Sequence, residues 1–168
     1  AADYINLERG VSDNGLTGGS GPFALNRLFE YVDHIHEMGR GVILDNGGKN
    51  DDYALAGFFL ISSGRDGVGL PHYSPSEPFA GAQVDLGDPA GPRETWHGML
   101  RRVFSRGVVL VNPPGNPRMQ IQPASFLRRA DRTKASAISL GPADGIVLFG
   151  ESTSGTALNS AVTVSPLK

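Results

Sequence analysis

The chain has 168 residues, enough for one ordinary domain, and 39% of them are hydrophobic, which allows a buried core. Its 15 Lys and Arg residues against 17 Asp and Glu residues give a formal net charge of −2, which argues against a dedicated nucleic-acid binder. The absence of cysteine excludes disulfides and thiolate metal sites. No apolar run approaches the roughly 18 residues that a membrane span requires.

The N-terminus reads "AADY", without Met, and shows no signal peptide. We therefore expect a mature or truncated N-terminus with further sequence upstream. A cysteine-free chain suits the cytoplasm and equally a secreted bacterial protein, so the composition leaves the compartment open.

The first half of the chain alternates between strand-like and helix-like patterns. The strands have short apolar runs, and the helices show a hydrophobic stripe or a Gly at their end. The expected strands are residues 3–10, 40–45 and 67–73, and the expected helices are residues 22–39 and 52–64. This alternation is typical of an α/β fold in which successive units build a parallel sheet or a barrel.

The second half has a different character. Residues 74–94 form a crossing rich in Pro and Gly, and a short helix is expected within residues 95–107. Residues 107–115, "GVVLVNPPG", predict a firm strand. Further on, "ASAISL" and "GIVLFG" flank "GPAD", which predicts a β-hairpin. The last third therefore reads as a small antiparallel β unit.

Two acidic residues follow the apolar runs of the first two strands, Glu8 after "YINL" and Asp45 after "GVIL". In a parallel α/β barrel, groups at the carboxyl ends of strands face the active site. A pair of carboxylates is the minimum requirement for glycoside hydrolysis, in which one protonates the leaving oxygen and the other attacks the sugar or activates water. Glu8 and Asp45 are therefore our candidate catalytic residues.

Structural roles compete with this interpretation. Asp45 could cap the helix that follows, a role for which Asp51 and Asp52 also compete. Glu8 could form an ion pair with its neighbour Arg9. Glu8 is the stronger candidate, because Glu is a poor turn residue and an unpaired buried Glu is costly.

Five further residues are candidates for binding a substrate. Aromatic rings stack on sugars, and carboxylates hydrogen-bond to them. These residues are Asp13, Tyr53, His72, Tyr73 and Trp96. Asp13 lies in the turn sequence "SDNG", and a single Trp is more often a core residue than a binding platform. Asp85, in "QVDLGDP", has the same turn chemistry. No pair of His residues has the spacing of metal ligands, so we predict neither a metal nor a cofactor.

Several segments together resemble glycoside hydrolases with a TIM-barrel fold. They are "INLERGVSDNGLTGG", "GVILD", "DDYALAGFFLISSG", "VDLGDPAG" and "RRVFSRGVVLVNPPG", with "RVFSRGVVLVNP" the most distinctive. The resemblance covers most of residues 3–115. It implies a barrel that leads into a C-terminal β domain, with Glu8 and Asp45 at the barrel mouth. Asp85 and Asn112 match motif positions without an assigned role.

The resemblance defines our expected fold class, an α/β partial (β/α) barrel of about three to four βα units followed by a small antiparallel β region. The partial barrel would span residues 1–106 and the β-rich region residues 107–168. A full barrel usually needs about 200 residues or more. We therefore expect a partner to cover the open sheet edges, either a second copy or a missing N-terminal portion.

The leading hypothesis is a glycoside-hydrolase-like enzyme that acts on a polysaccharide or glycoconjugate, with Glu8 as general acid/base and Asp45 as nucleophile, base or electrostatic partner. The alternative is a non-catalytic carbohydrate-binding or assembly module. A phosphate-dependent α/β enzyme is a third possibility, but "GLTGGSG" lacks the Lys-Ser/Thr ending of a phosphate loop.

Overall fold

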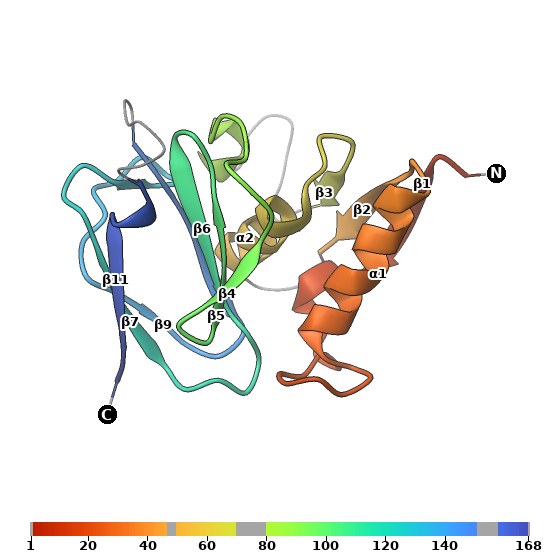
Figure 1. Cartoon of the computed structure of the whole chain (residues 1–168), viewed down its shortest axis with the longest axis horizontal. Coiled ribbons are helices and arrows are strands. Elements are labelled where there is room, and N and C mark those ends of the chain that lie inside the picture. The colour runs from red at the N-terminus through yellow and green to blue at the C-terminus, as the bar shows by residue number, and fades with distance from the viewer. Residues whose placement is uncertain (1, 47–49, 70–79, 151–157, 168) are drawn as a thin grey trace.

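The computed structural model describes residues 2–46, 50–69, 80–150 and 158–167 (Figure 1). Its helices are α1 (Leu25–Glu37), α2 (Asp51–Ile61) and the 3₁₀ turns η1 (Gly10–Ser12) and η2 (Ala80–Gln83). Its strands are β1 (Tyr4–Glu8), β2 (Gly41–Asp45), β3 (Gly67–Gly69), β4 (Glu94–Trp96), β5 (Met99–Val103), β6 (Gly107–Asn112), β7 (Met119–Pro123), β8 (Arg128–Arg129), β9 (Ile138–Leu140), β10 (Asp144–Phe149) and β11 (Val162–Pro166).

The strands β1, β2 and β3 form a parallel sheet in that order, joined by α1 and α2. Alternate residues of these strands point to opposite faces. On one face Leu7, Val42 and Leu44 pack with buried side chains of α1 and α2. On the other face Tyr4 and Ile43 remain 53% and 40% exposed. The helices therefore cover only one side of this sheet.

The remaining strands form two antiparallel sheets, β4-β5-β6-β10-β8 and β11-β7-β9. All six residues of β6 are buried, because neighbours contact opposite cores. Val109 and Val111 belong to the cluster that includes α2, whereas Val108 and Leu110 belong to the cluster between the two antiparallel sheets. The sheet containing β6 is thus the middle layer of the molecule (Figure 1).

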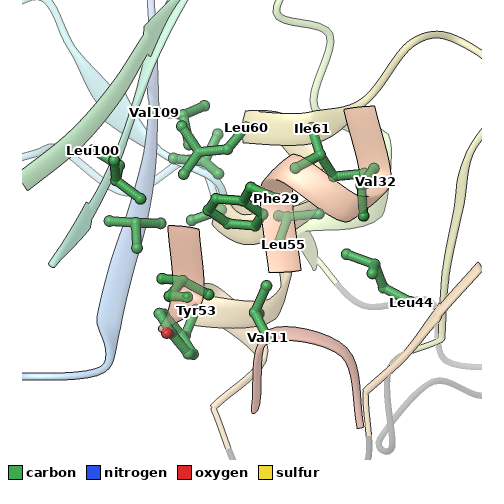
Figure 2. Packing of buried hydrophobic residues seen from close by; sticks show 14 of the residues in the cluster. Val11, Phe29, Val32, Leu44, Tyr53, Leu55, Leu60, Ile61, Leu100 and Val109 are labelled. Carbon is green, nitrogen blue, oxygen red and sulfur yellow. The ribbon is translucent and has the colours of Figure 1, made fainter. Parts of the chain in front are cut away.

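Helix α2 lies between this middle sheet and the parallel sheet, which explains why it is apolar on nearly every side (Figure 1). Its small residues permit close approach on two sides. A Cβ on Gly57 would lie 2.7 Å from the side chain of Val11, and one on Gly145 would lie 2.8 Å from Cβ of Ala56. Figure 2 shows Val11 and Tyr53 at the margin of the resulting cluster, which also holds Phe29.

The structure contradicts the predicted fold class. A partial (β/α) barrel of three to four units would need a growing parallel sheet, but among the described residues this sheet has three strands and does not close. From residue 94 onward, every strand pair described is antiparallel. Within the described residues, the alternation of strands and helices that begins with β1 ends at β3, after α1 and α2.

Two local predictions in the second half were also wrong. The segment expected to hold a short helix, residues 95–107, forms the hairpin β4–β5, because His97 and Gly98 both adopt positive φ and turn the chain back. The segments "ASAISL" and "GIVLFG" do not pair with each other. Instead β9 pairs with β7, and β10 pairs with β6 and β8, so the "GPAD" turn passes between sheets.

No helix in the described part of the chain has the length and apolarity needed to cross a membrane.

A buried carboxylate holds the ends of the parallel sheet together. Oδ1 of Asp66 accepts hydrogen bonds from N of Val42 and lies 2.8 Å from Nε2 of His36, while Oδ2 accepts from N and Oγ of Ser63. Burial opposes ionisation of Asp66, but these hydrogen bonds outweigh it and hold its pKa below the ordinary value. The carboxylate therefore links α1, β2 and the loop before β3.

We expect Asp66→Asn to destabilise the fold by about 2 kcal/mol at pH 7, because an amide nitrogen would face donors that need an acceptor. A carboxyl with a lowered pKa stabilises the fold above its unfolded pKa of about 3.9 and loses that contribution as pH falls through its folded pKa. The difference in the free energy of unfolding between wild type and variant should therefore be constant from pH 7 to about pH 5 and become smaller below about pH 4. Urea unfolding measures this, with the exposed Asp3→Asn as the control. An equal loss of stability at every pH would contradict the role of ionised Asp66 as the acceptor of these hydrogen bonds.

Candidate functional site

The two predicted catalytic carboxylates lie side by side at the carboxyl end of the parallel sheet. Glu8 and Asp45 are paired in the register of β1 and β2 and are the last residues of their strands. Register partners on adjacent parallel strands point to the same face, and the strands are about 4.8 Å apart. Both residues are exposed on the face that the helices leave open.

The space around this pair is set by its neighbours. Asp45 is also in register with Gly69 of β3, where a Cβ would lie 3.1 Å from Oδ1 of Asp45, so glycine leaves room for the carboxylate. Nε of Arg9 lies 3.9 Å from Oε1 of Glu8. These side chains are 58% and 84% exposed, and such an ion pair contributes little to stability. It does place a positive charge beside Glu8.

Asp45 does not cap the helix that follows it. The N-cap of α2 is Asn50, whose Oδ1 accepts a hydrogen bond of 3.0 Å from N of Tyr53. Asp51 and Asp52 occupy the first turn, where a negative charge interacts favourably with the positive end of the helix dipole. The capping role that competed for Asp45 therefore belongs to another residue.

A cleft of about 800 Å³ lies where the chain leaves β1 and enters α2. Turns before and after strands of the middle sheet close its other side, so it lies between the parallel and antiparallel parts of the molecule. Its lining residues are Arg9, Val11, Ser12, Asp13, Asn14, Leu16, Asn50, Tyr53, Pro114 and Ala143. Ligand sites favour both such boundaries and the carboxyl ends of parallel strands.

The backbone at the rim of this cleft is held in an unusual conformation. Arg9 and Ala143 have positive φ angles of 64° and 52°. Residues with a Cβ rarely adopt this region of backbone conformation. The two residues come from distant parts of the chain and both line the cleft. Such strain is often found at functional sites, where the surrounding structure maintains it.

Tyr53 lies at the base of the cleft and is only 2% exposed. Burial raises the pKa of its hydroxyl, and the nearby charge of Asp144 raises it further, so the phenol stays protonated. Its Oη is buried and has no hydrogen-bond partner among the described residues, and the same is true of Oγ of Ser12. Two buried hydroxyls of residues that line the cleft therefore lack a hydrogen-bond partner within the part of the chain that the structure describes.

Asp13 combines the turn role that its sequence suggests with a place in the cleft. Its Oδ1 accepts a hydrogen bond of 2.7 Å from N of Gly15, which fixes the loop. Asp13 also lines the cleft, where its charge is opposite in sign to that of Arg9. The structure therefore brings together Asp13 and Tyr53, two of the five predicted binding residues, whereas Glu8 is not among the lining residues although its neighbour Arg9 is.

Acidic residues beside the cleft are tied into the fold. Asp144 accepts hydrogen bonds from Nδ2 of Asn50 and N of Gly145. Burial raises the pKa of Asp52, which the contact with Arg129 at 3.2 Å partly offsets. These contacts join α2 to β8 and β10 and hold the N-terminus of α2 against the middle sheet.

Trp96, the third predicted binding residue that the structure describes, does not line this cleft. The guanidinium of Arg101 lies over its ring at 4.5 Å from the ring centre, and the ring packs against the second core. His72 and Tyr73 lie outside the described residues.

Two residues that match motif positions have structural partners. Asp85 accepts a hydrogen bond from N of Gly87 and pairs with Arg106, which together hold its pKa below the ordinary value. Asn112 is fully buried and donates to backbone carbonyls around β6 and β9.

Sequence reasoning missed four polar residues of the cleft, Arg9, Ser12, Asn14 and Asn50, as ligand-binding candidates. Asn50 could have been found from its place directly before the helix, since Asn is a favoured N-cap residue. The others belong to a Gly-rich loop whose path over the cleft depends on contacts with the distant turn after β6, where a Cβ on Gly18 would overlap O of Pro114.

No group of His, Cys, Asp and Glu in the described part of the chain has the arrangement of a metal site. Comparison of the chain with protein-family models, curated proteins and solved structures finds no match.

Proposed function

We propose that this chain is a glycoside-hydrolase-like protein that cleaves glycosidic bonds of a polysaccharide or glycoconjugate. One observation carries the proposal: the register pairing of Glu8 and Asp45 at the carboxyl ends of adjacent parallel strands. The backbones of adjacent strands lie about 4.8 Å apart, so two carboxyl groups that extend from them on one face can reach the separation of about 5 Å used by retaining glycosidases.

The reaction assigned to this pair has two steps. First, Asp45 attacks the anomeric carbon while Glu8 donates its proton to the glycosidic oxygen, so that the C–O bond breaks and the leaving sugar departs as an alcohol. Then Glu8 removes a proton from water, which attacks the same carbon and releases Asp45. Each attack inverts the anomeric carbon, so the product retains the original configuration.

The test is incubation of the protein with a panel of neutral polysaccharides, following release of reducing ends and the configuration of the first product by proton NMR. We expect release from at least one substrate, with retention at the anomeric carbon. An inverted product would contradict the role of Asp45 as nucleophile. No release from any substrate would favour the second candidate function.

That second candidate is a non-catalytic carbohydrate-binding module. The observation in its favour is the exposure of the pair, since the side chain of Glu8 is 84% exposed. Catalytic acids are usually set to their task by partial burial, which this position lacks. Binding of a panel member without release of reducing ends would identify the chain as such a module.

A further inference from the structure

Two residues that line the cleft carry buried hydroxyls without a hydrogen-bond partner among the residues that the structure describes. Tyr53 is only 2% exposed, yet its Oη has no hydrogen-bond partner among the described residues. Oγ of Ser12 is likewise buried and without a partner among them. Buried hydroxyls are nearly always satisfied in folded proteins, and an unsatisfied one destabilises the fold. Tyr53 and Ser12 are both among the residues that line the cleft, so both hydroxyls belong to residues that a single ligand would contact.

The charged residues around the cleft indicate the charge of a ligand that would fit there. Among its lining residues Arg9 and Asp13 carry opposite charges, so neither sign dominates. The N-terminus of α2 would favour an anion, but Asp51 and Asp52 already occupy its first turn. A strongly charged ligand of either sign would therefore meet a like charge.

The remaining lining alternates polar and apolar groups. Ser12, Asn14 and Tyr53 offer hydroxyl and amide groups, whereas Leu16 and Pro114 offer apolar surface. A sugar ring has the same two kinds of surface, with hydroxyls at its edge and C–H groups on its faces. Small-molecule sites combine apolar contacts with a few placed polar groups, and in this cleft more of the exposed lining is polar than apolar.

From these observations we infer that the cleft binds one neutral sugar ring of the substrate, with the hydroxyls of Tyr53 and Ser12 hydrogen-bonded to hydroxyls of that ring. This inference rests on the proposed function in one respect, namely that the bound sugar ring is part of the substrate. It adds a binding site separate from the exposed sheet face that carries Glu8 and Asp45.

The experiment is a ¹⁵N-HSQC titration of the whole chain with four neutral tetrasaccharides (cellotetraose, xylotetraose, maltotetraose and tetra-N-acetylchitotetraose) and with the anionic tetragalacturonate. At least one neutral tetrasaccharide should shift the amide signals of the loop from Ser12 to Asn14 and of Tyr53. The anionic tetrasaccharide should bind more weakly. The amide signals of Tyr4 and Ile43, on the open sheet face, report binding at the other location.

Tyr53→Phe is the matched variant, because it removes only the hydroxyl oxygen. Since that oxygen has no hydrogen-bond partner in the described ranges of the chain, the variant should unfold at the same temperature as wild type or a higher one. Its affinity for the sugar should fall about tenfold, the effect of losing one good hydrogen bond in a buried site. Tyr31→Phe, on the exposed side of α1, should change neither quantity.

Three outcomes would overturn the inference. No neutral tetrasaccharide shifts the loop signals at millimolar concentration, tetragalacturonate binds best, or Tyr53→Phe binds as tightly as wild type. Binding that shifts Tyr4 and Ile43 but not the loop signals, with release of reducing ends, would overturn this site and leave the proposed function standing. Binding at the loop without any release of reducing ends would support this site and contradict the proposed function.

Discussion

Glu8→Gln should lower the rate of glycoside hydrolysis about a thousandfold, which is within the usual range for loss of a general acid/base. Glutamine has nearly the same shape but cannot donate a proton to the leaving oxygen or accept one from water. Because the side chain is 84% exposed, the substitution should leave the free energy of unfolding within about 0.5 kcal/mol of wild type. Initial rates and urea unfolding measure the two effects separately.

The matched control is Glu30→Gln on α1. Glu30 also pairs with an arginine, Arg27 at 2.6 Å, and is 57% exposed, so the same chemical change occurs far from the carboxylate pair. It should leave the rate unchanged. Full activity of Glu8→Gln would remove the general acid/base from the proposed mechanism. Equal loss in both variants would show that the effect is not specific to the site.

Asn112→Asp should destabilise the fold by about 4 kcal/mol at pH 8, the largest effect on stability that we expect. Asn112 is completely buried, and its Nδ2 lies 2.9 Å from O of Pro117, 3.2 Å from O of Leu140 and 2.9 Å from O of Gly141. Aspartate would put an oxygen, and at neutral pH a charge, in front of these carbonyls. The buried carboxyl would have a raised pKa.

The raised pKa gives this variant a distinct pH dependence. A protonated carboxyl can donate one hydrogen bond to the carbonyls, so the loss of stability should shrink as pH falls from 8 to about 5. Urea unfolding at several pH values measures it, with the exposed Asn26→Asp as the control. A loss below about 1 kcal/mol at pH 8 would contradict the role of Asn112 as the polar link between β6 and the turn after β9.

The sequence was informative wherever local pattern and burial agreed. The strand at residues 40–45 and the helix at 22–39 appear as β2 and α1 because apolar runs and an amphipathic stripe have few competing interpretations. Gly39, with a φ of 72°, ends α1 as its position suggested. The pairing of Glu8 with Asp45 follows from these short units, because both strands end at the acidic residue.

The fold class was wrong because the repeated units suggested a longer series than exists. Nothing local in "TWHGMLRRVF" distinguishes a helix from the β4–β5 hairpin, since the decisive feature is the positive φ of His97 beside Gly98. The same limit applies to β9 and β10. Their strand character was correctly predicted, but their partners, β7 and β6, depend on which core each apolar face contacts.

The cleft was only partly predictable. Asp13 and Tyr53 were selected for their chemistry, and both line it. The contributions of Pro114 and Ala143 come from turns more than a hundred residues away from Ser12 in the sequence, and no local pattern brings these turns to Ser12. Sites between two packed parts of a chain depend on long-range contacts of this kind.

The central claim is that Glu8 and Asp45 form a retaining active site, and the most direct measurement is covalent trapping. The protein is incubated with a panel of 2-deoxy-2-fluoroglycosides carrying good leaving groups, which slow hydrolysis of a glycosyl-enzyme intermediate, and its peptides are analysed by mass spectrometry. We expect one fluorosugar on Asp45 in wild type and none in Asp45→Asn. A sugar attached to a different residue, or no labelling by a panel member that the protein hydrolyses, would contradict the claim.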